Sequence, residues 1–411
     1  MRLNLSYKRI FLILILIIGI GVSIFIILPI ITDEEPYFIT IKSDEHLKIW
    51  SNSGNGTIEN PYIIEGHHIT IPENDFDVYD VPCFPENSVI SIYNITKSFI
   101  LQNNHIVVKG GCNRVQQYII SISDISVPFR IQNNYLRGGY GGIRLHNIDA
   151  HNSIISNNTI YYAGLTISNS QNISFILNQY IYSYSQYAFQ CNNINYIQNH
   201  YYLTSINIRE SSHVLVYDNI FENDETYSGW SRLTLWESKY CTITNNTLIK
   251  TGLELRNFDT FYSSTIVSGN SINGKPFGFF YNQSNTMINS TIKYGQIKLV
   301  KCYNAIITDQ VISETSSPLM IENCTKTTVT NSTFSHCSWA GVNIKSSVNT
   351  SIINCFLEDN YSGVEGENSY GIIIKSNLFK ELMFGVFLKT CTLLTMEDNV
   401  FEKVDTEIMS W

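Results

Sequence analysis

The feature that most restricts how this chain can fold is an internal repeat. Along most of the sequence, an apolar residue is followed three positions later by a residue that is most often Asn, and two positions after that by a second apolar residue. The segment from Ile155 to Ile160 shows the pattern, with Asn158 at the turn position. Every flanking position is apolar except for the phenol of Tyr202. The turn positions are Asn104, Asn134, Asn158, Gln179, His200, Asn219, Asn246, Asn270, Ser290, Gln310, Ser332, Cys355, Asn377 and Asn399.

Neighbouring turn positions lie 19 to 24 residues apart, except for two intervals of 30 and 27 residues that indicate insertions. A unit this short cannot bury its own apolar face, but stacked units pair each strand with the strands above and below it. Asn suits the turns because it tolerates left-handed backbone and its side chain can hydrogen-bond a neighbouring coil. The sequence therefore predicts an all-β, right-handed parallel β-helix solenoid of about 14 to 15 coils over residues 63–404, with a period of about 22 residues.

Two other repeat folds agree less well with this pattern. A leucine-rich repeat requires a regular Leu framework, whereas the apolar positions here mix Ile, Val and Phe. A β-propeller requires blades of about 40 residues or more, nearly twice the observed period.

The N-terminus carries a membrane-insertion signal. Residues 10–31 form an uncharged apolar run that is long enough to cross a bilayer as a helix, with basic residues before it and three acidic residues after it. This charge asymmetry places residues 1–9 in the cytoplasm and the chain from Thr32 outside. A cleaved signal peptide is the alternative, but no small-x-small cleavage site follows the run. We therefore expect a single-pass membrane protein whose extracellular or periplasmic β-helix has an N-terminal cap at 32–62 and a short C-terminal cap at 405–411.

The charge of the chain restricts its partners. Charged residues make up 15% of the sequence, and the net charge of −9 is spread without long runs of one sign. No basic patch is present for a phosphate backbone, so nucleic acid is not an expected partner. Asn-x-Ser/Thr tripeptides would suit glycosylation of an exported glycoprotein, although a chain so rich in these residues also produces them by chance. These acceptors include Asn55, Asn94, Asn172, Asn282, Asn289, Asn323, Asn349 and Asn360.

One segment resembles a known group of proteins. Residues 54–66 read Gly-Asn-Gly-Thr-Ile-Glu-Asn-Pro-Tyr-Ile-Ile-Glu-Gly. This resembles the N-terminal motif of archaeal and bacterial surface proteins with right-handed β-helix repeats, which are similar to the NosD-like periplasmic β-helix group. The resemblance implies the fold but no single activity, because the wider class includes polysaccharide lyases, epimerases, a copper-site maturation factor and many adhesin-like proteins.

An acidic cluster is the first candidate site. Asp218, Glu222, Asp224 and Glu225 precede the longer interval that contains Trp230 and Trp236. Inserted loops on solenoids often form the binding face. Carboxylates beside exposed Trp rings could bind a sugar chain, or cleave it if two acids face each other across the glycosidic bond. An ordinary polar surface loop is the alternative interpretation. Glu222, Asp218 and Glu225 are thus the candidate catalytic residues.

A group of tyrosines is the second candidate site. Tyr161, Tyr162, Tyr182 and Tyr184 fall in successive coils with further tyrosines between and after them, and not all of these rings can lie in the interior. Flat rings along a groove could stack on pyranose faces. Aromatic stacking that only stabilises the sheet is the alternative.

No metal or cofactor site is expected. The histidines do not recur at a spacing typical of ligands, and only six Met residues are present for a soft copper site. Cys302 and Cys324 occupy the same phase of neighbouring coils, which predicts a buried column of thiols, since parallel side chains give poor disulfide geometry.

These observations order three functions. The first is non-catalytic binding of glycans or other cell-surface components in an adhesion or envelope role. The second is a carbohydrate-active enzyme, namely a polysaccharide lyase, hydrolase or epimerase, which no coherent catalytic constellation supports. The third is a NosD-like metal-site maturation factor. Expected partners are the membrane, through the N-terminal helix, a polysaccharide or cell-surface protein, and a second copy of the chain at the distal end, where Met409 and Trp411 offer apolar contacts.

Overall fold

The computed structural model describes residues 38–71, 88–109, 118–138, 141–183, 185–224, 232–256 and 259–410. The predicted cytoplasmic tail and membrane anchor, together with the first residues of the predicted cap, lie outside these ranges. So do the candidate site residues Tyr184, Glu225 and Trp230, and the terminal Trp411. Within the described ranges, no helix has the length and apolarity needed to cross a bilayer.

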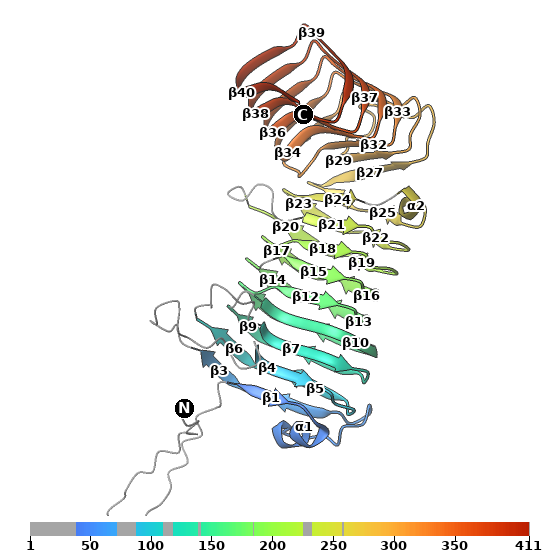
Figure 1. Cartoon of the computed structure of the whole chain (residues 1–411). Coiled ribbons are helices and arrows are strands. Elements are labelled where there is room, and N and C mark those ends of the chain that lie inside the picture. The colour runs from blue at the N-terminus through green and yellow to red at the C-terminus, as the bar shows by residue number, and fades with distance from the viewer. Residues whose placement is uncertain are drawn as a thin grey trace, which may run out of the picture. The chain divides into compact units, whose positions relative to one another are not determined.

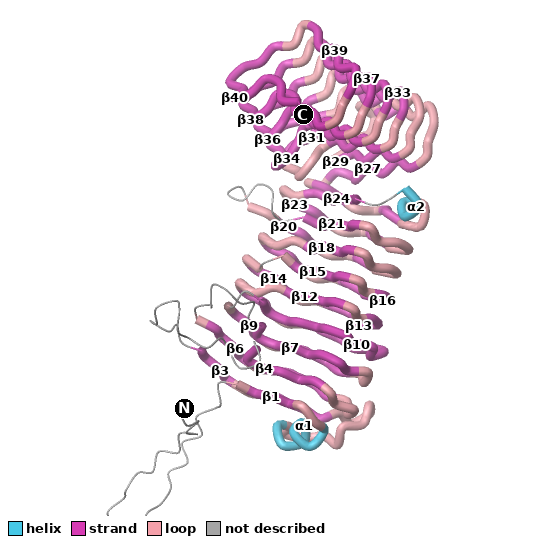
Figure 2. Tube along the Cα trace, in the orientation of Figure 1, coloured by secondary structure: helices cyan, strands magenta, loops and turns pink. Residues whose placement is uncertain are grey.

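The described chain is an all-β parallel solenoid of about 13 turns with a period of about 22 residues. This confirms the predicted fold class, and the number of turns is slightly below the predicted 14 to 15. Strands of successive coils pair in parallel, which forms ladders that run along the solenoid (Figure 1). Helices are nearly absent from the described chain (Figure 2): α1 covers Asp44–Trp50 and α2 covers Asp259–Tyr262.

The strands form two stacks. In the first stack, ladder A contains β1 (Ile39–Ile41), β4 (Ser88–Tyr93), β7 (Tyr118–Ile125), β10 (Gly141–Ser156), β12 (Leu165–Ser168), β15 (Gln186–Phe189), β18 (Ile206–Arg209), β21 (Arg232–Trp236) and β24 (Gly252–Arg256). Ladder B contains β2 (Tyr62–Glu65), β5 (Phe99–Gln102), β8 (Phe129–Gln132), the second half of β10, β13 (Gln171–Ile176), β16 (Asn192–Ile197), β19 (Leu215–Tyr217), β22 (Thr242–Thr244) and β25 (Ile266–Ser268). Ladder C contains β3 (His68–Ile71), β6 (His105–Val108), β9 (Tyr135–Arg137), β11 (Thr159–Tyr161), β14 (Gln179–Ile181), β17 (His200–Tyr202), β20 (Ile220–Glu222), β23 (Thr247–Ile249) and β26 (Ser271–Ile272).

The second stack follows an antiparallel pairing of β26 with β27. Its ladder D contains β27 (Lys275–Tyr281), β29 (Gln296–Val300), β31 (Val311–Ser313), β32 (Leu319–Glu322), β34 (Thr333–Lys345), β36 (Phe356–Glu367), β38 (Leu378–Lys389) and β40 (Val400–Ser410). Ladder E contains β28 (Met287–Ile288), β30 (Ile306–Thr308), β33 (Thr325–Thr330), β35 (Val348–Ile353), β37 (Tyr370–Lys375) and β39 (Thr392–Glu397). We call the place where the two stacks meet the junction.

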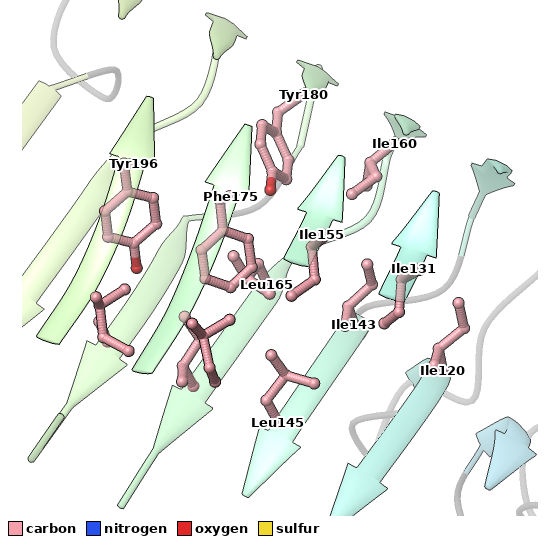
Figure 3. Packing of buried hydrophobic residues seen from close by; sticks show 14 of the residues in the cluster. Ile120, Ile131, Ile143, Leu145, Ile155, Ile160, Leu165, Phe175, Tyr180 and Tyr196 are labelled. Carbon is pink, nitrogen blue, oxygen red and sulfur yellow. The ribbon is translucent and has the colours of Figure 1, made fainter. Parts of the chain in front are cut away.

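The inward side chains explain why the coils stack. Alternate residues of each strand point into the solenoid, where they form columns of Ile, Leu and aromatic residues (Figure 3). Phe175 stacks on Tyr196 with 5.2 Å between ring centroids, and Tyr180 stacks on Tyr201 at 4.9 Å. The second stack has a core cluster of its own, which begins near Ile288. Burial of these columns supplies the apolar contribution that a single coil lacks.

A column of buried Asn side chains connects the coils of the first stack. In each coil the backbone N–H of one Asn donates to the Oδ1 of the next, for example Asn134 to Asn158 at 3.0 Å. Its Nδ2 donates to a carbonyl of the preceding coil, as Asn158 does to Ile131 at 2.9 Å. The left-handed backbone belongs to the residue before the ladder Asn, such as Asn157 with φ of 53°. The column consists of Asn104, Asn134, Asn158, Asn178, Asn199, Asn219, Asn246 and Asn270.

Three predicted coils have the wrong register. The ladder residues in two of them are Asn178 and Asn199, one position before the predicted turn residues Gln179 and His200. In the coil assigned to Ser290, the predicted interior residues Met287 and Ile292 are exposed. Because side chains alternate between the two faces of a strand, a shift of one residue moves each predicted interior residue to the outside.

The ends of the solenoid also differ from the prediction. At the N-terminal end, strand β1 already pairs with β4, and the helix α1 places Leu47 in the core, so part of the predicted cap belongs to the solenoid. The predicted C-terminal cap at 405–411 continues strand β40 as far as Ser410. Among the predicted glycosylation acceptors, Asn360 is buried and its Oδ1 accepts a hydrogen bond from the backbone of Cys337 at 2.9 Å, which is incompatible with a glycan there.

Candidate functional site

A pocket of about 670 Å³ opens at the junction. We call it the junction pocket, and residues from both stacks line it. Its lining combines two Trp residues, five Glu residues, three cations and two Asn residues. The lining residues are Trp236, Glu237, Glu254, Leu255, Arg256, Lys298, Ser317, Met320, Ile321, Glu322, Asn323, Trp339, Asn343, Lys345, Ser346, Glu365 and Glu367.

Trp236 enters the pocket from the end of β21. Arg209 of the preceding coil lies 4.8 Å from its ring centroid, and Arg256 of the following coil lies at 5.9 Å. These three residues are aligned by the strand register, so the guanidinium groups stack along ladder A with the indole. The indole N–H donates to Glu237 at 2.9 Å. The sequence analysis selected Trp236 as a binding residue, and the structure places it in the pocket lining.

Trp339 enters the pocket from the second stack. It lies in β34, is 42% exposed, and stacks on Tyr361 of the next coil with 5.2 Å between centroids and 16° between planes. Phe384, one coil further, meets Tyr361 edge to face at 5.5 Å. In the described part of the chain, no other ring or cation stacks on Trp339. This indole therefore offers an aromatic surface at the pocket that rests on a row of rings.

Glu365 is the most unusual carboxylate of the pocket. It accepts hydrogen bonds from the Trp339 indole N–H and from Asn343 Nδ2, the latter at 3.3 Å. Burial raises the pKa of Glu365, and the charge of Glu367 adds to the rise, whereas the two hydrogen bonds and the charge of Arg256 oppose it. A carboxyl with a raised pKa in a cleft is a frequent property of functional sites.

A buried ionic group forms the deepest part of the lining. Lys298 Nζ lies 2.5 Å from Glu322 Oε2, and both side chains are at most 10% exposed. The hydroxyl of Tyr262 donates either to the same carboxylate oxygen or to the carbonyl of Leu255, each at 2.9 Å. Tyr262 and Leu255 precede the junction, while Lys298 and Glu322 follow it. The group therefore links the two stacks through side chains.

The remaining carboxylates of the lining contact cations. Glu254 forms ion pairs with Arg256 and, at 3.0 Å, with Arg232. Glu367 lies between Lys345 at 4.0 Å and Lys389 at 3.8 Å.

The acidic residues proposed from the sequence lie outside this lining and contact different partners. Asp218 sits in the turn before β20 with φ of 55° and accepts a hydrogen bond from Gln198 at 2.9 Å. Glu222 ends β20 and lies 3.2 Å from His200. The described residues thus do not bring these two carboxylates together into one site.

The surface tyrosines do form a cluster, on ladder C. Tyr161 and Tyr162 meet edge to face at 4.6 Å, and Tyr162 stacks on Tyr182 at 5.6 Å. Tyr202 contacts Tyr182 at 5.3 Å, and Arg137 lies over the Tyr161 ring at 5.5 Å. The interior takes up Tyr180, Tyr196 and Tyr201. This cluster is an exposed surface, separate from the junction pocket.

Most residues of the junction pocket carry no signal in the sequence. One available signal was the spacing of Trp339 and Tyr361, which are 22 residues apart and so occupy equivalent outward positions. The rest of the lining comes from coils on both sides of a break in the repeat, and no periodic pattern predicts their proximity. No group of three or more His, Cys, Asp or Glu side chains among the described residues is arranged to hold a metal ion.

The cysteine column is present. Cys302 and Cys324 are buried, and the backbone N–H of Cys302 donates to the sulfur of Cys324 at 3.3 Å. The hydrogen bond between the two thiols lowers the pKa of Cys302 to about 7 and raises that of Cys324.

Comparison with known proteins supports the fold. Residues 278–408 match the family model described as right handed beta helix region. This segment lies within the second stack, and together with the parallel ladders it identifies a β-helix repeat protein. No curated protein matches the sequence significantly.

Solved structures with similar folds share little sequence with this chain. Tailspike protein 3 of bacteriophage CBA120 is 10% identical, with a TM-score of 0.28 over 85% of this chain and 54% of the tailspike. The A-module of a mannuronan C-5 epimerase from Azotobacter vinelandii is 9% identical, with a TM-score of 0.27 over 76% of this chain and 89% of the module. A surface protein and adhesin of Streptococcus pneumoniae is 9% identical, with a TM-score of 0.27 over 84% of this chain and 91% of the adhesin. The chain spans about half the length of the tailspike.

Proposed function

We propose that this protein binds carbohydrate in the junction pocket, as a surface protein held at the outer face of a membrane by residues 10–31. The anchor, the outward orientation and the NosD-like resemblance of residues 54–66 are predictions from the sequence. The observation that supports carbohydrate binding is the exposed Trp339 ring, bordered by Glu365 and Asn343, in a pocket large enough for several sugar rings.

The chemistry of the lining suits a sugar. A pyranose presents an apolar face of C–H groups, which an indole covers, and a rim of hydroxyl groups, which carboxylates and amides can bind. The Trp339 indole can cover the apolar face of the sugar. Glu365, which accepts hydrogen bonds from this indole and from Asn343, can bind the hydroxyl groups together with Asn343.

A carbohydrate-active enzyme is the second candidate. Glu365 would supply the general acid of such an enzyme, since burial raises the pKa of its carboxyl and a general acid protonates the glycosidic oxygen. Glu254, which pairs with Arg232 and Arg256, is the candidate for the second carboxyl group of such a pair. A catalytic pair requires both groups to flank one bond, so activity depends on the pose of the bound chain.

A glycan-array assay on the purified full-length protein tests both candidates. The variant Trp339→Ala should weaken binding about 30-fold, because truncation of a central Trp typically costs about 2 kcal/mol of binding energy. Tyr370→Ala is the control, since Tyr370 is an exposed aromatic residue on ladder E outside the pocket lining. Shortening of bound polysaccharides that Glu365→Gln abolishes would favour the enzyme; binding to no glycan would contradict both candidates.

A further inference from the structure

We infer that the junction pocket selects glycans that carry protonated amino groups, such as chains of free amino sugars, and disfavours glycans of uronic acids. This inference rests on the proposed carbohydrate binding and identifies the class of ligand.

The cations of the lining are already engaged. Lys298 is buried in its contact with Glu322, and Arg256 pairs with Glu254 while it stacks on Trp236. Lys345 lies 4.0 Å from Glu367. A uronic acid that enters the pocket would have to displace one of these carboxylates to obtain a cation. The buried pair in particular cannot exchange partners without leaving Glu322 uncompensated.

In contrast to these paired cations, two carboxylates of the lining lack an ion-pair partner among the described residues. Glu237 and Glu365 have no cation within ion-pair distance in the part of the chain that the structure describes. Arg256 is close enough to affect Glu365 electrostatically but is paired elsewhere. Among the described residues, the hydrogen-bond donors to Glu237 and Glu365 are the pocket indoles and Asn343.

The preference for amino groups follows from where Glu237 and Glu365 lie in the pocket. Each of the two carboxylates binds an indole N–H of the pocket, Glu237 that of Trp236 and Glu365 that of Trp339. In the described residues, one oxygen of each carboxylate has no partner. A sugar ring that stacks beside Trp339 would bring its substituents close to Glu365. An ammonium substituent could then donate to a carboxylate in a partly desolvated site, where charge-assisted hydrogen bonds are strong. A carboxylate substituent would meet like charge.

The test compares three ligands of equal length by calorimetric titration of the full-length protein: a fully deacetylated glucosamine tetramer, its N-acetylated counterpart and a tetragalacturonate. We expect the deacetylated tetramer to bind at least 10-fold more tightly than the acetylated one, with an advantage that falls as salt is added, and the galacturonate to bind most weakly.

Three variants assign the effect to the pocket. Glu365→Gln keeps an acceptor for the indole but removes the charge, so it should reduce the preference for the deacetylated tetramer over the acetylated one to below about 3-fold. Trp339→Ala should weaken binding of both. Glu381→Gln changes a carboxylate outside the pocket that pairs with Lys403 at 2.7 Å, and it should leave the preference unchanged.

The outcomes separate the two proposals. Equal binding of both glucosamine tetramers, or tighter binding of the galacturonate, would overturn the selectivity and leave carbohydrate binding in place. A preference that Glu365→Gln does not change would also overturn the assignment to this pocket. Absence of binding by all three tetramers, together with an empty glycan array, would contradict carbohydrate binding itself.

Discussion

At the scale of single residues, the buried ion pair of Lys298 and Glu322 in the junction pocket affects the stability of the protein. Their charges are almost completely removed from water, and Tyr262 adds a further hydrogen bond to the carboxylate. Such a pair gains little over apolar residues of the same volume, but the loss of one partner leaves an uncompensated charge in the interior.

We therefore predict that Lys298→Met lowers the free energy of unfolding by about 3–5 kcal/mol, whereas Lys298→Met combined with Glu322→Met recovers most of the loss. Lys375→Met is the matched control, because Lys375 pairs with Glu397 at 2.6 Å on the surface, where an ion pair contributes little to stability. Denaturant titration followed by circular dichroism measures all three. If Lys298→Met alone lowered the free energy of unfolding no more than Lys375→Met does, the pair would not be buried in solution.

Glu365 gives a second prediction at this scale, because its pKa is raised in the folded protein. Burial and the nearby Glu367 raise it, against the charge of Arg256 and the hydrogen bonds from Trp339 and Asn343. Between the unfolded value, near 4.5, and the higher folded value, the native state holds more protons than the unfolded state. Stability therefore falls as the pH rises through that window.

The variant Glu365→Gln removes this titration. We expect the stability of the variant relative to the unaltered protein to increase as the pH rises from the unfolded pKa through the raised folded pKa, and to stay level above the folded pKa. Unfolding free energies of both proteins at several pH values provide the measurement. A difference that is constant with pH would show that Glu365 titrates normally.

At the scale of the repeating element, the buried Asn column determines the register of each coil. Asn158 illustrates its role, since its Oδ1 accepts from both the backbone N–H and the Nδ2 of Asn134, at 3.0 and 2.9 Å. We predict that Asn158→Ala costs about 2–5 kcal/mol, because it leaves the buried backbone N–H of Asn134 without an acceptor and removes the hydrogen bond from Asn158 Nδ2 to the carbonyl of Ile131. Asn207→Ala should change stability by no more than about 0.5 kcal/mol, since Asn207 is half-buried in β18 and makes no side-chain hydrogen bond in the described structure. Equal losses in thermal or chemical denaturation would contradict this role of the column.

The same column shows how much of the fold the sequence could predict. The period, the strand content and most interior positions follow from the alternation of apolar and Asn positions. Register was ambiguous where two polar residues are adjacent, as in Asn178 with Gln179, since both choices leave apolar residues at the flanking positions. The stacking of Phe175 on Tyr196 of the neighbouring coil determines which register is adopted. The sequence of one coil alone does not predict this contact, because it forms between coils.

At the scale of the whole described body, the continuity of strand pairing is broken at the junction. Strand β24 pairs with β21 alone among the described strands, and β25 pairs only with β22. Across the break, the backbone N–H of Leu253 donates to the side chain of Gln296 at 2.9 Å. The junction pocket exists because the coils on either side do not stack there. The prediction of the fold depended on the period of the repeat. Because the break interrupts this period, the sequence predicts the fold but not the pocket.

The break also predicts how the molecule unfolds. Solenoid stability is a sum of repeat terms and nearest-neighbour interface terms. An interface made by side chains and the short antiparallel pair of β26 and β27 should therefore couple the two stacks less strongly than continuous parallel strand pairing does. We expect native-state hydrogen exchange, followed by mass spectrometry, to give one opening free energy for peptides within 141–249 and a different one for peptides within 297–388. Peptides on the two sides of β18, which continuous pairing joins, serve as the internal control and should open together. A ligand in the junction pocket contacts both stacks, so saturating ligand should raise the opening free energy of both and reduce the difference between them. A single opening free energy for the whole body without ligand would mean that the side-chain contacts of the junction, including the buried pair of Lys298 and Glu322, couple the stacks as firmly as a strand ladder does.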